Sequence, residues 1–164
     1  MATARRSPQL EPSPPRGSQG DLSAEDAAPI GRLLVRAGVV TKDVVDAALA
    51  VQRKSFRPLG RILREEHGVS PEALAEALRR QKHIPRVFLR FFPVDVQALR
   101  LLDRRFCAEQ EVVAFERLGS LLCVALSNPS RRDLFQQLRT QSTFEIAPFR
   151  APWEDIQKVL KDHA

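Results

Sequence analysis

The chain is poor in the residues that build disulfide frameworks and metal clusters. It has two cysteines and three histidines among 164 residues. Cys107 and Cys123 both stand in apolar surroundings, which suits a reduced cytosolic protein. No apolar run approaches the roughly 20 residues that cross a membrane, and the N-terminus lacks an apolar signal core. We therefore expect a cytoplasmic protein with no metal site and no membrane insertion.

Recognisable catalytic signatures are lacking as well. No glycine-rich loop is followed by Lys and Ser or Thr, so there is no Walker A phosphate cradle. His67, His83 and His163 stand far apart and lack the spacing of zinc ligands. Glu65 and Glu66 beside His67 would point in different directions on a helix, which favours a solvated helix end over acid–base chemistry. We expect that the chain is not an enzyme and has no cofactor.

Positive charge is present in excess. Lys and Arg total 26 against 20 Asp and Glu, which gives a formal charge of +6. This excess favours an anionic partner such as a nucleotide, a nucleic acid or an acidic protein surface. The hydrophobic content of 43% is enough for a packed core, and the length fits one domain or two small ones.

The same pattern occurs twice in the first half of the chain. Pro-Ile-Gly-Arg-Leu-Leu begins at Pro29, and Pro-Leu-Gly-Arg-Ile-Leu begins at Pro58. The copies continue in register to Gln52 and Gln81, and internal repetition of this kind indicates duplicated structural units. In each copy the apolar spacing predicts a short helix, a turn and a longer helix. Two such hairpins predict a four-helix layer.

Composition divides the chain into three segments. Residues 1–28 are rich in Pro, Ser and Gly, which predicts a disordered tail. Residues 29–83 hold the tandem helical repeat. Residues 84–164 predict a small α+β subdomain, with strands at 112–117, 121–126 and 143–149 and helices at 94–102, 129–140 and 153–161. The β-β-α-β-α order predicts a mostly antiparallel three-stranded sheet, and the whole chain is expected to be α+β.

The two copies resemble the MshEN-type motif, Arg-Leu-Gly-x-x-Leu-x-x-x-Gly-x-x-x-x-x-x-Leu-x-x-x-Leu-x-x-Gln. This motif is found in the N-terminal domain of type II secretion and type IV pilus assembly ATPases, including the GspE N-terminal domain. The resemblance extends over about residues 29–164. The first copy matches at Ile30, Gly31, Leu34, Gly38, Val45, Leu49 and Gln52, and the second at Leu59, Gly60, Leu63, Leu74, Leu78 and Gln81.

The resemblance implies a regulatory or binding function. In the family, tandem motifs can bind the bacterial second messenger cyclic di-GMP, and the domain docks the ATPase to its membrane platform. The sequence stops before any catalytic domain, so the resemblance implies a stand-alone regulatory or adaptor form that contacts a secretion, pilus or motility machine. The implied ligand-binding residues are Gly31, Leu34, Leu49, Gln52, Gly60, Leu63, Leu78 and Gln81.

Each residue type in this set has a chemical role. The glycines would let backbone amides approach a phosphate near helix starts, and the leucines would cover base and ribose faces. The glutamines offer donor and acceptor groups to guanine edges. The alternative assigns the leucines to the core, the glycines to close helix packing and the glutamines to helix bridging.

Both copies depart from the motif at its leading arginine, which is replaced by Pro29 and Pro58. Proline cannot supply the planar charged fork of arginine, and each lost charge-assisted contact costs roughly 1.5–3 kcal/mol. His67 stands where the second copy should have glycine. These departures favour an alternative function, a pure protein–protein adaptor with a degenerate nucleotide site.

A basic and aromatic stretch supports a third hypothesis. Basic residues with interleaved aromatics can bind single-stranded nucleic acid by stacking and phosphate contact. Because no RNP, KH or helix-turn-helix signature accompanies the stretch, we do not expect nucleic acid as the partner. We expect the phenylalanines to be buried between the subdomains and the arginines to stay solvated. The stretch consists of Arg79, Arg80, Lys82, Arg86 and Arg90 with Phe88, Phe91 and Phe92.

Overall fold

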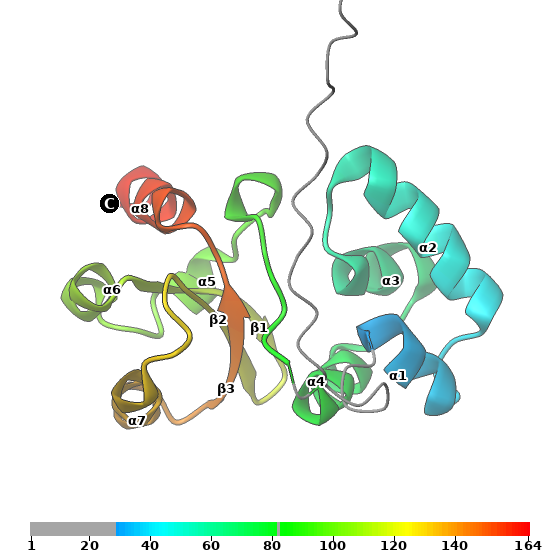
Figure 1. Cartoon of the computed structure of the whole chain (residues 1–164), viewed down its shortest axis with the longest axis horizontal. Coiled ribbons are helices and arrows are strands. Elements are labelled where there is room, and N and C mark those ends of the chain that lie inside the picture. The colour runs from blue at the N-terminus through cyan, green and yellow to red at the C-terminus, as the bar shows by residue number, and fades with distance from the viewer. Residues whose placement is uncertain (1–28, 82) are drawn as a thin grey trace, which may run out of the picture.

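The computed structural model describes residues 29–81 and 83–164, so the tail predicted for residues 1–28 lies outside the described residues. Figure 1 shows the helices of residues 30–80 on one side of a small sheet and helices of the second half on the other side. The elements are α1 Ile30–Arg36, α2 Lys42–Ser55, α3 Leu59–His67, α4 Pro71–Arg80, the 3₁₀ turn η1 Leu89–Phe91, α5 Val96–Leu99, α6 Arg104–Gln110, β1 Val112–Leu118, β2 Leu121–Leu126, α7 Arg132–Gln141, β3 Glu145–Arg150 and α8 Trp153–Asp162.

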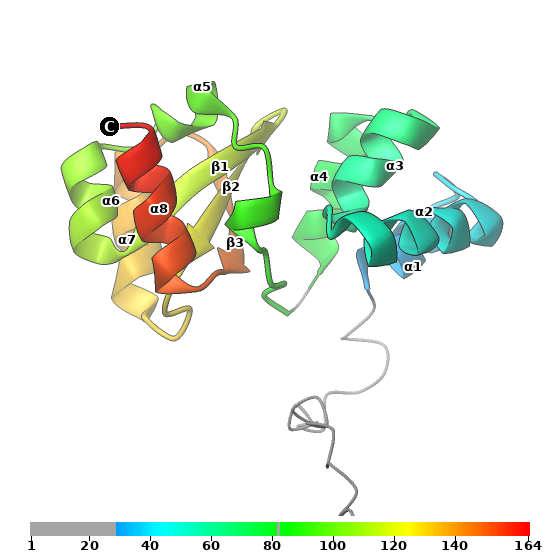
Figure 2. The same ribbon diagram turned by 90° about the horizontal axis from the view of Figure 1, so that it is seen from above.

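The repeat forms the predicted four-helix layer (Figure 2), with α2 packed on α3 and α1 packed on α4. The longer helix of each copy begins after a hydroxyl cap, at Thr41 and at Ser70. The Thr41 hydroxyl accepts the backbone N–H of Val44 at 3.4 Å, and the Ser70 hydroxyl accepts that of Ala73 at 3.2 Å. Each cap satisfies a backbone donor that the first helical turn leaves unpaired.

The two copies differ at the turn between their helices. In the first copy the turn contains Gly38, whose φ is +71°. In the second copy α3 continues to His67, and Gly68 closes the helix with φ at +66°. The glycine of the second copy therefore stands one position later because α3 is the longer helix.

The sheet has three strands in the order β1-β2-β3, and the predicted α+β fold class is confirmed. β1 and β2 form the expected antiparallel hairpin, turning at Gly119 with φ at +60°. β3 runs parallel to β2, so the sheet is mixed and not mostly antiparallel. The reason is the crossover through α7, which returns the chain to the sheet in the direction of β2.

In the second half, one helix was not predicted from the sequence and another begins later than predicted. The apolar spacing did not indicate α6, which Asp103 caps by accepting the backbone N–H of Phe106 at 2.9 Å. The first residues of the helix predicted at 129–140 form a turn instead, in which the Asn128 amide oxygen accepts the N–H of Ser130 at 3.1 Å. α7 begins at Arg132, after this turn.

β2 is buried along its whole length because both faces of the sheet are covered. On one face, side chains such as Phe115 and Cys123 join a core shared with the repeat and with α8. On the opposite face, Leu122 and Val124 pack with residues of α5, α6 and α7. Within the described part of the chain, no helix is long and apolar enough to span a bilayer.

Candidate functional site

A cavity of about 190 Å³ lies between the repeat and the sheet. We call it the junction cavity, because its walls come from both halves of the chain. Residues of the repeat form one wall, and residues of β1, β2, β3 and the segment before η1 form the other. The lining residues are Ile30, Gln52, Pro58, Leu59, Gly60, Arg61, Leu74, Leu78, Gln81, Pro85, Arg86, Val87, Phe92, Phe115, Glu116, Leu118, Cys123 and Phe149.

The two copies of the repeat contribute equivalent residues to this cavity. Ile30 and Leu59 precede the motif glycine in each copy, and both line the junction cavity. Gln52 and Gln81 end the motif in each copy, and they line it as well. The duplication therefore directs corresponding positions toward one shared site.

Four of the eight candidate ligand-binding residues line the cavity, and four lie elsewhere. Gln52, Gly60, Leu78 and Gln81 are lining residues. Leu34 and Leu63 are wholly buried in the core, Gly31 is buried in α1, and Leu49 is half-buried on α2. The structure thus brings together both glutamines but only one of the glycines and one of the leucines.

The two motif glycines meet different surroundings. A Cβ atom at Gly31 would lie 2.8 Å from Cγ1 of Val45, closer than van der Waals contact allows. A Cβ atom at Gly60 would lie 3.5 Å from Cδ2 of Leu74, which is an ordinary contact. Gly31 is therefore needed for the close packing of α1 on α2. Gly60 is not needed for packing, and it lines the junction cavity without a side chain.

Gln81 carries an incompletely satisfied amide at the edge of the cavity. It is the C-cap residue of α4, and its Nε2 lies 3.2 Å from Nε2 of His83. Its Oε1 is buried without a hydrogen-bond partner among the described residues. Because buried polar atoms normally find a partner, the unpartnered oxygen makes this edge of the cavity a candidate ligand contact.

Glu116 is a charged cavity residue that the sequence analysis did not identify. Its side chain is 13% exposed, and Oε1 accepts a hydrogen bond from the Arg64 guanidinium of α3 at 2.9 Å. Burial raises the pKa of the Glu116 carboxyl, and the charges of Arg64 and Arg61 oppose that rise. The sequence did not indicate that Glu116 faces the cavity, because regular strand alternation would place Phe115 and Glu116 on opposite faces of the sheet.

An irregularity in β1 brings these two neighbours to the same face. Ala114 pairs with Val124 and Glu116 pairs with Cys123, so Phe115 is an extra residue without a partner in β2. A β-bulge of this kind reverses the alternation beyond it and redirects side chains. Both Phe115 and Glu116 consequently line the junction cavity.

The remaining sheet residues make the cavity floor apolar. Phe115 and Phe149 pack edge to face, with ring centroids 5.1 Å apart. Cys123 lies beside them, and burial raises the pKa of its thiol, so the sulfur stays protonated. Apolar and aromatic walls with few polar groups are typical of sites for small organic ligands.

Two arginines near the motif positions, Arg57 and Arg61, are engaged elsewhere in the fold. Pro29 and Pro58 are the N-cap residues of α1 and α3. Arg57 forms ion pairs with Glu65 and with Glu66, the latter at 2.8 Å. The Glu66 hydrogen bond raises the pKa of Arg57, while the Arg61 hydrogen bond lowers that of Glu65.

Arg61 is fixed along one wall of the cavity. Its Nε donates to Glu65 at 2.7 Å, and a terminal nitrogen donates to the carbonyl of Pro93 at 3.1 Å. Its guanidinium also lies 5.1 Å from the centre of the Phe92 ring. These contacts tie α3 to the second half of the chain.

The basic and aromatic stretch is largely paired within the fold. Arg79 bonds Glu145 at 2.7 Å, and Arg90 bonds the buried Asp155 at 2.8 Å. Phe92 is buried as expected, but Phe88 and Phe91 are exposed. Lys82 lies outside the described residues. Within residues 29–81 and 83–164, no group of three His, Cys, Asp or Glu side chains is placed to hold a metal ion.

Comparison with known proteins places the chain near pilus assembly ATPases. It is similar to the type IV pilus assembly ATPase PilB of Myxococcus xanthus, with 24% identity over 80% of this chain, and to that of Thermus thermophilus, with 30% identity over 94%. The chain spans only 23% and 17% of these relatives. Because the two alignments cover 80% and 94% of this chain, each includes at least part of the repeat.

Solved structures of N-terminal domains are similar as well. A structure of MshE with cdg has 25% identity and a TM-score of 0.49, and it covers 84% of this chain and 99% of that chain. The N-terminal domain of XpsE has 16% identity and a TM-score of 0.42, and it covers 80% and 91%. The model of the MshEN domain family matches residues 83–164, which is half of the chain. The chain therefore belongs to the MshEN domain family.

Proposed function

We propose that the chain is a non-catalytic sensor module that binds cyclic di-GMP at the junction cavity and signals to a secretion or pilus machine. One observation carries the proposal. The two copies of the repeat bring corresponding residues, Ile30 with Leu59 and Gln52 with Gln81, to one apolar cavity. A duplicated motif that converges on a single site suits a ligand that is itself built from two similar halves.

The size of the cavity limits how such a ligand binds. Sites for drug-sized ligands measure about 300–1,000 Å³, and the junction cavity measures about 190 Å³. It therefore accepts one guanine base, with the phosphates and the second base outside. Pro58, Leu59 and Gly60 place the start of α3 at the cavity, where unpaired backbone N–H groups favour a phosphate.

Arg86 supports the anionic part of the ligand. It lines the cavity, is exposed, and stacks on the Phe88 ring at 4.6 Å. The motif arginines are absent, so we expect weaker binding than two charge-assisted contacts would give. A micromolar dissociation constant is consistent with the loss of one or two such contacts at roughly 1.5–3 kcal/mol each.

Calorimetric titration with cyclic di-GMP tests this proposal. We expect binding in the micromolar range or tighter, and at least a tenfold loss when Gln52→Ala and Gln81→Ala are combined. Gln136→Ala with Gln141→Ala is the matched control, because both of these glutamines are exposed on α7. The absence of heat and of a thermal shift at millimolar nucleotide would overturn the proposal.

A protein–protein adaptor is the second candidate, and the aromatic surface favours it. Phe56 is 63% exposed and Phe91 is 45% exposed, and their rings stack at 5.4 Å across the two halves. If the adaptor function is correct, the purified chain retains a pilus or secretion ATPase in a pull-down without nucleotide. Phe56→Ser should then reduce retention, whereas the exposed Val39→Ser should not.

A further inference from the structure

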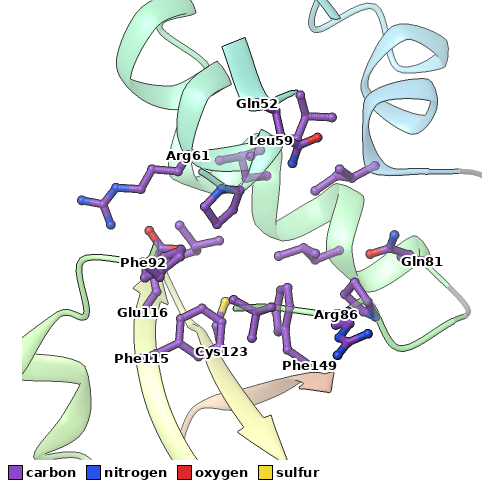
Figure 3. A pocket seen from close by; sticks show the side chains of 18 residues that line it. Gln52, Leu59, Arg61, Gln81, Arg86, Phe92, Phe115, Glu116, Cys123 and Phe149 are labelled. Carbon is purple, nitrogen blue, oxygen red and sulfur yellow. The ribbon is translucent and has the colours of Figure 1, made fainter. Parts of the chain in front are cut away.

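Besides Gln52, polar side chains stand at two ends of the junction cavity. Figure 3 shows Glu116 below Arg61 at one end and Gln81 beside Arg86 at the other, with Phe115, Cys123 and Phe149 between them. A flat, apolar ligand that enters this space meets a carboxylate along one edge. Whether that edge of the ligand carries hydrogen-bond donors or acceptors decides which ligand binds.

Glu116 has one oxygen available for such a ligand. Its Oε1 accepts the Arg64 hydrogen bond at 2.9 Å, and Oε2 has no hydrogen-bond partner among residues 29–81 and 83–164. The ion pair with Arg64 also holds the side chain in place between α3 and β1. A carboxylate accepts hydrogen bonds and donates none, so it selects an edge that carries N–H donors.

We propose that Glu116, redirected into the cavity by the bulge at Phe115, is the specificity-determining residue that selects a guanine base through its N1–H and 2-amino donors. This inference rests on the proposed function, since it names the base that the same site accepts. Adenine presents an acceptor at N1 and has no 2-amino group, so it meets the carboxylate with one lone pair opposite another. Hypoxanthine keeps N1–H but lacks the 2-amino group.

The purely structural interpretation of Glu116 predicts a different result. If the residue only joins α3 to β1 through Arg64, its removal lowers the stability of the fold and weakens all nucleotides equally. If it reads the base, its removal changes the preference among bases. The ratio of two affinities therefore separates the two roles.

The experiment titrates the full chain with cyclic di-GMP, with its inosine counterpart cyclic di-IMP and with cyclic di-AMP. We expect cyclic di-GMP to bind about tenfold or more tightly than cyclic di-IMP, because one hydrogen bond to a charged group is lost. Glu116→Gln replaces an acceptor oxygen with an N–H donor and should reduce that ratio to about threefold or less. Cyclic di-AMP should bind most weakly to the wild-type chain.

Glu145→Gln is the matched control. Glu145 also pairs with an arginine of the repeat, Arg79 at 2.7 Å, but it lies outside the cavity lining. We expect this variant to keep the wild-type preference. Equal binding of cyclic di-GMP and cyclic di-IMP by the wild-type chain overturns the inference even if Glu116→Gln fails to fold. An unchanged ratio in a folded Glu116→Gln variant overturns it as well, and binding of no nucleotide at all overturns the proposed function instead.

Discussion

The two motif glycines occupy equivalent positions but perform different tasks. At Gly31 an added methyl group would collide with Val45, a buried β-branched residue with few alternative rotamers. At Gly60 the same methyl group would meet Leu74 at an ordinary distance and extend into the junction cavity. Duplication has therefore left one glycine to helix packing and the other to the site.

Alanine at each glycine distinguishes these tasks. We expect Gly31→Ala to lower the free energy of unfolding by about 1–3 kcal/mol, the usual cost of overpacking a core. Gly60→Ala should be neutral or stabilising by up to about 1 kcal/mol, because alanine favours helix. Urea unfolding measures both values. Equal destabilisation by the two substitutions would contradict the packing role of Gly31.

The raised pKa of Glu116 makes part of the stability depend on pH. Because burial raises its pKa in the folded state above the ordinary value of 4.5, the folded chain holds the proton more tightly than the unfolded chain. Its contribution is fully present below about pH 4.5 and is lost as the pH rises through the raised pKa.

Unfolding at a series of pH values checks this sign. The stability of the wild-type chain minus that of Glu116→Gln should fall as the pH rises from about 4.5 toward neutrality, since glutamine does not titrate. Glu145→Gln is the reference for a pair on the exterior of the same junction. A difference that stays constant with pH would show that burial does not perturb Glu116.

At the scale of elements, the sequence predicted what depends on neighbouring residues and missed what depends on distant ones. Helical apolar spacing identified the four repeat helices because this signal is local, and the caps that the structure shows at Thr41 and Ser70 are local features too. The parallel pairing of β3 was not predicted, because it depends on where α7 returns the chain. The bulge at Phe115 was hidden for a similar reason, since β2 defines it and β1 alone does not.

The candidate site shows the same division. The motif located Gln52 and Gln81, and the structure brings both to the cavity. The apolar pattern could not separate Leu34 and Leu63, which are core, from Leu78, which lines the cavity. All of them have helical spacing, and only the position of the sheet decides which face of each helix remains open. The predicted boundary between the repeat (residues 29–83) and the α+β subdomain (residues 84–164) stays a prediction.

The contribution of the Ser70 cap to the stability of α4 can be measured directly. Ser70→Ala removes the hydrogen bond to the Ala73 N–H and should lower the free energy of unfolding by about 1 kcal/mol, within the usual range for a lost cap. Ser130→Ala, at an exposed turn before α7, should change it by less than about 0.5 kcal/mol. Chemical denaturation compares the two variants, and equal effects would show that the Ser70 cap is dispensable.

At the scale of the whole molecule, one apolar core runs through both halves of the chain. Leu34 and Leu63 of the repeat belong to the same cluster as Phe115 of the sheet and Ile156 of α8. Ion pairs such as Arg64 with Glu116 add polar contacts across the same junction. A shared core predicts that the repeat and the α+β part unfold together.

Trp153, the chain's single tryptophan, reports on this coupling because it begins α8 and packs against the shared core. We expect its fluorescence and the far-ultraviolet circular dichroism to give coincident unfolding transitions. Leu63→Ala, at a distance along the chain, should cost about 2–5 kcal/mol and shift both transitions equally. Two separate transitions would instead show that the halves are independent domains.

The bulge at Phe115 makes the chemistry of the cavity depend on chain length. Side chains alternate with a period of two, so the loss of one residue between Ala114 and Glu116, with the hairpin turn kept in register, would restore regular pairing with β2. The remaining residue would still pair with Cys123 and face the cavity, so the cavity would hold either an aromatic ring or a carboxylate there in place of both. Relatives that lack this single residue would therefore be expected to differ in what they recognise, even where every aligned residue is identical. A survey limited to point substitutions would not detect that difference, whereas deletion variants would.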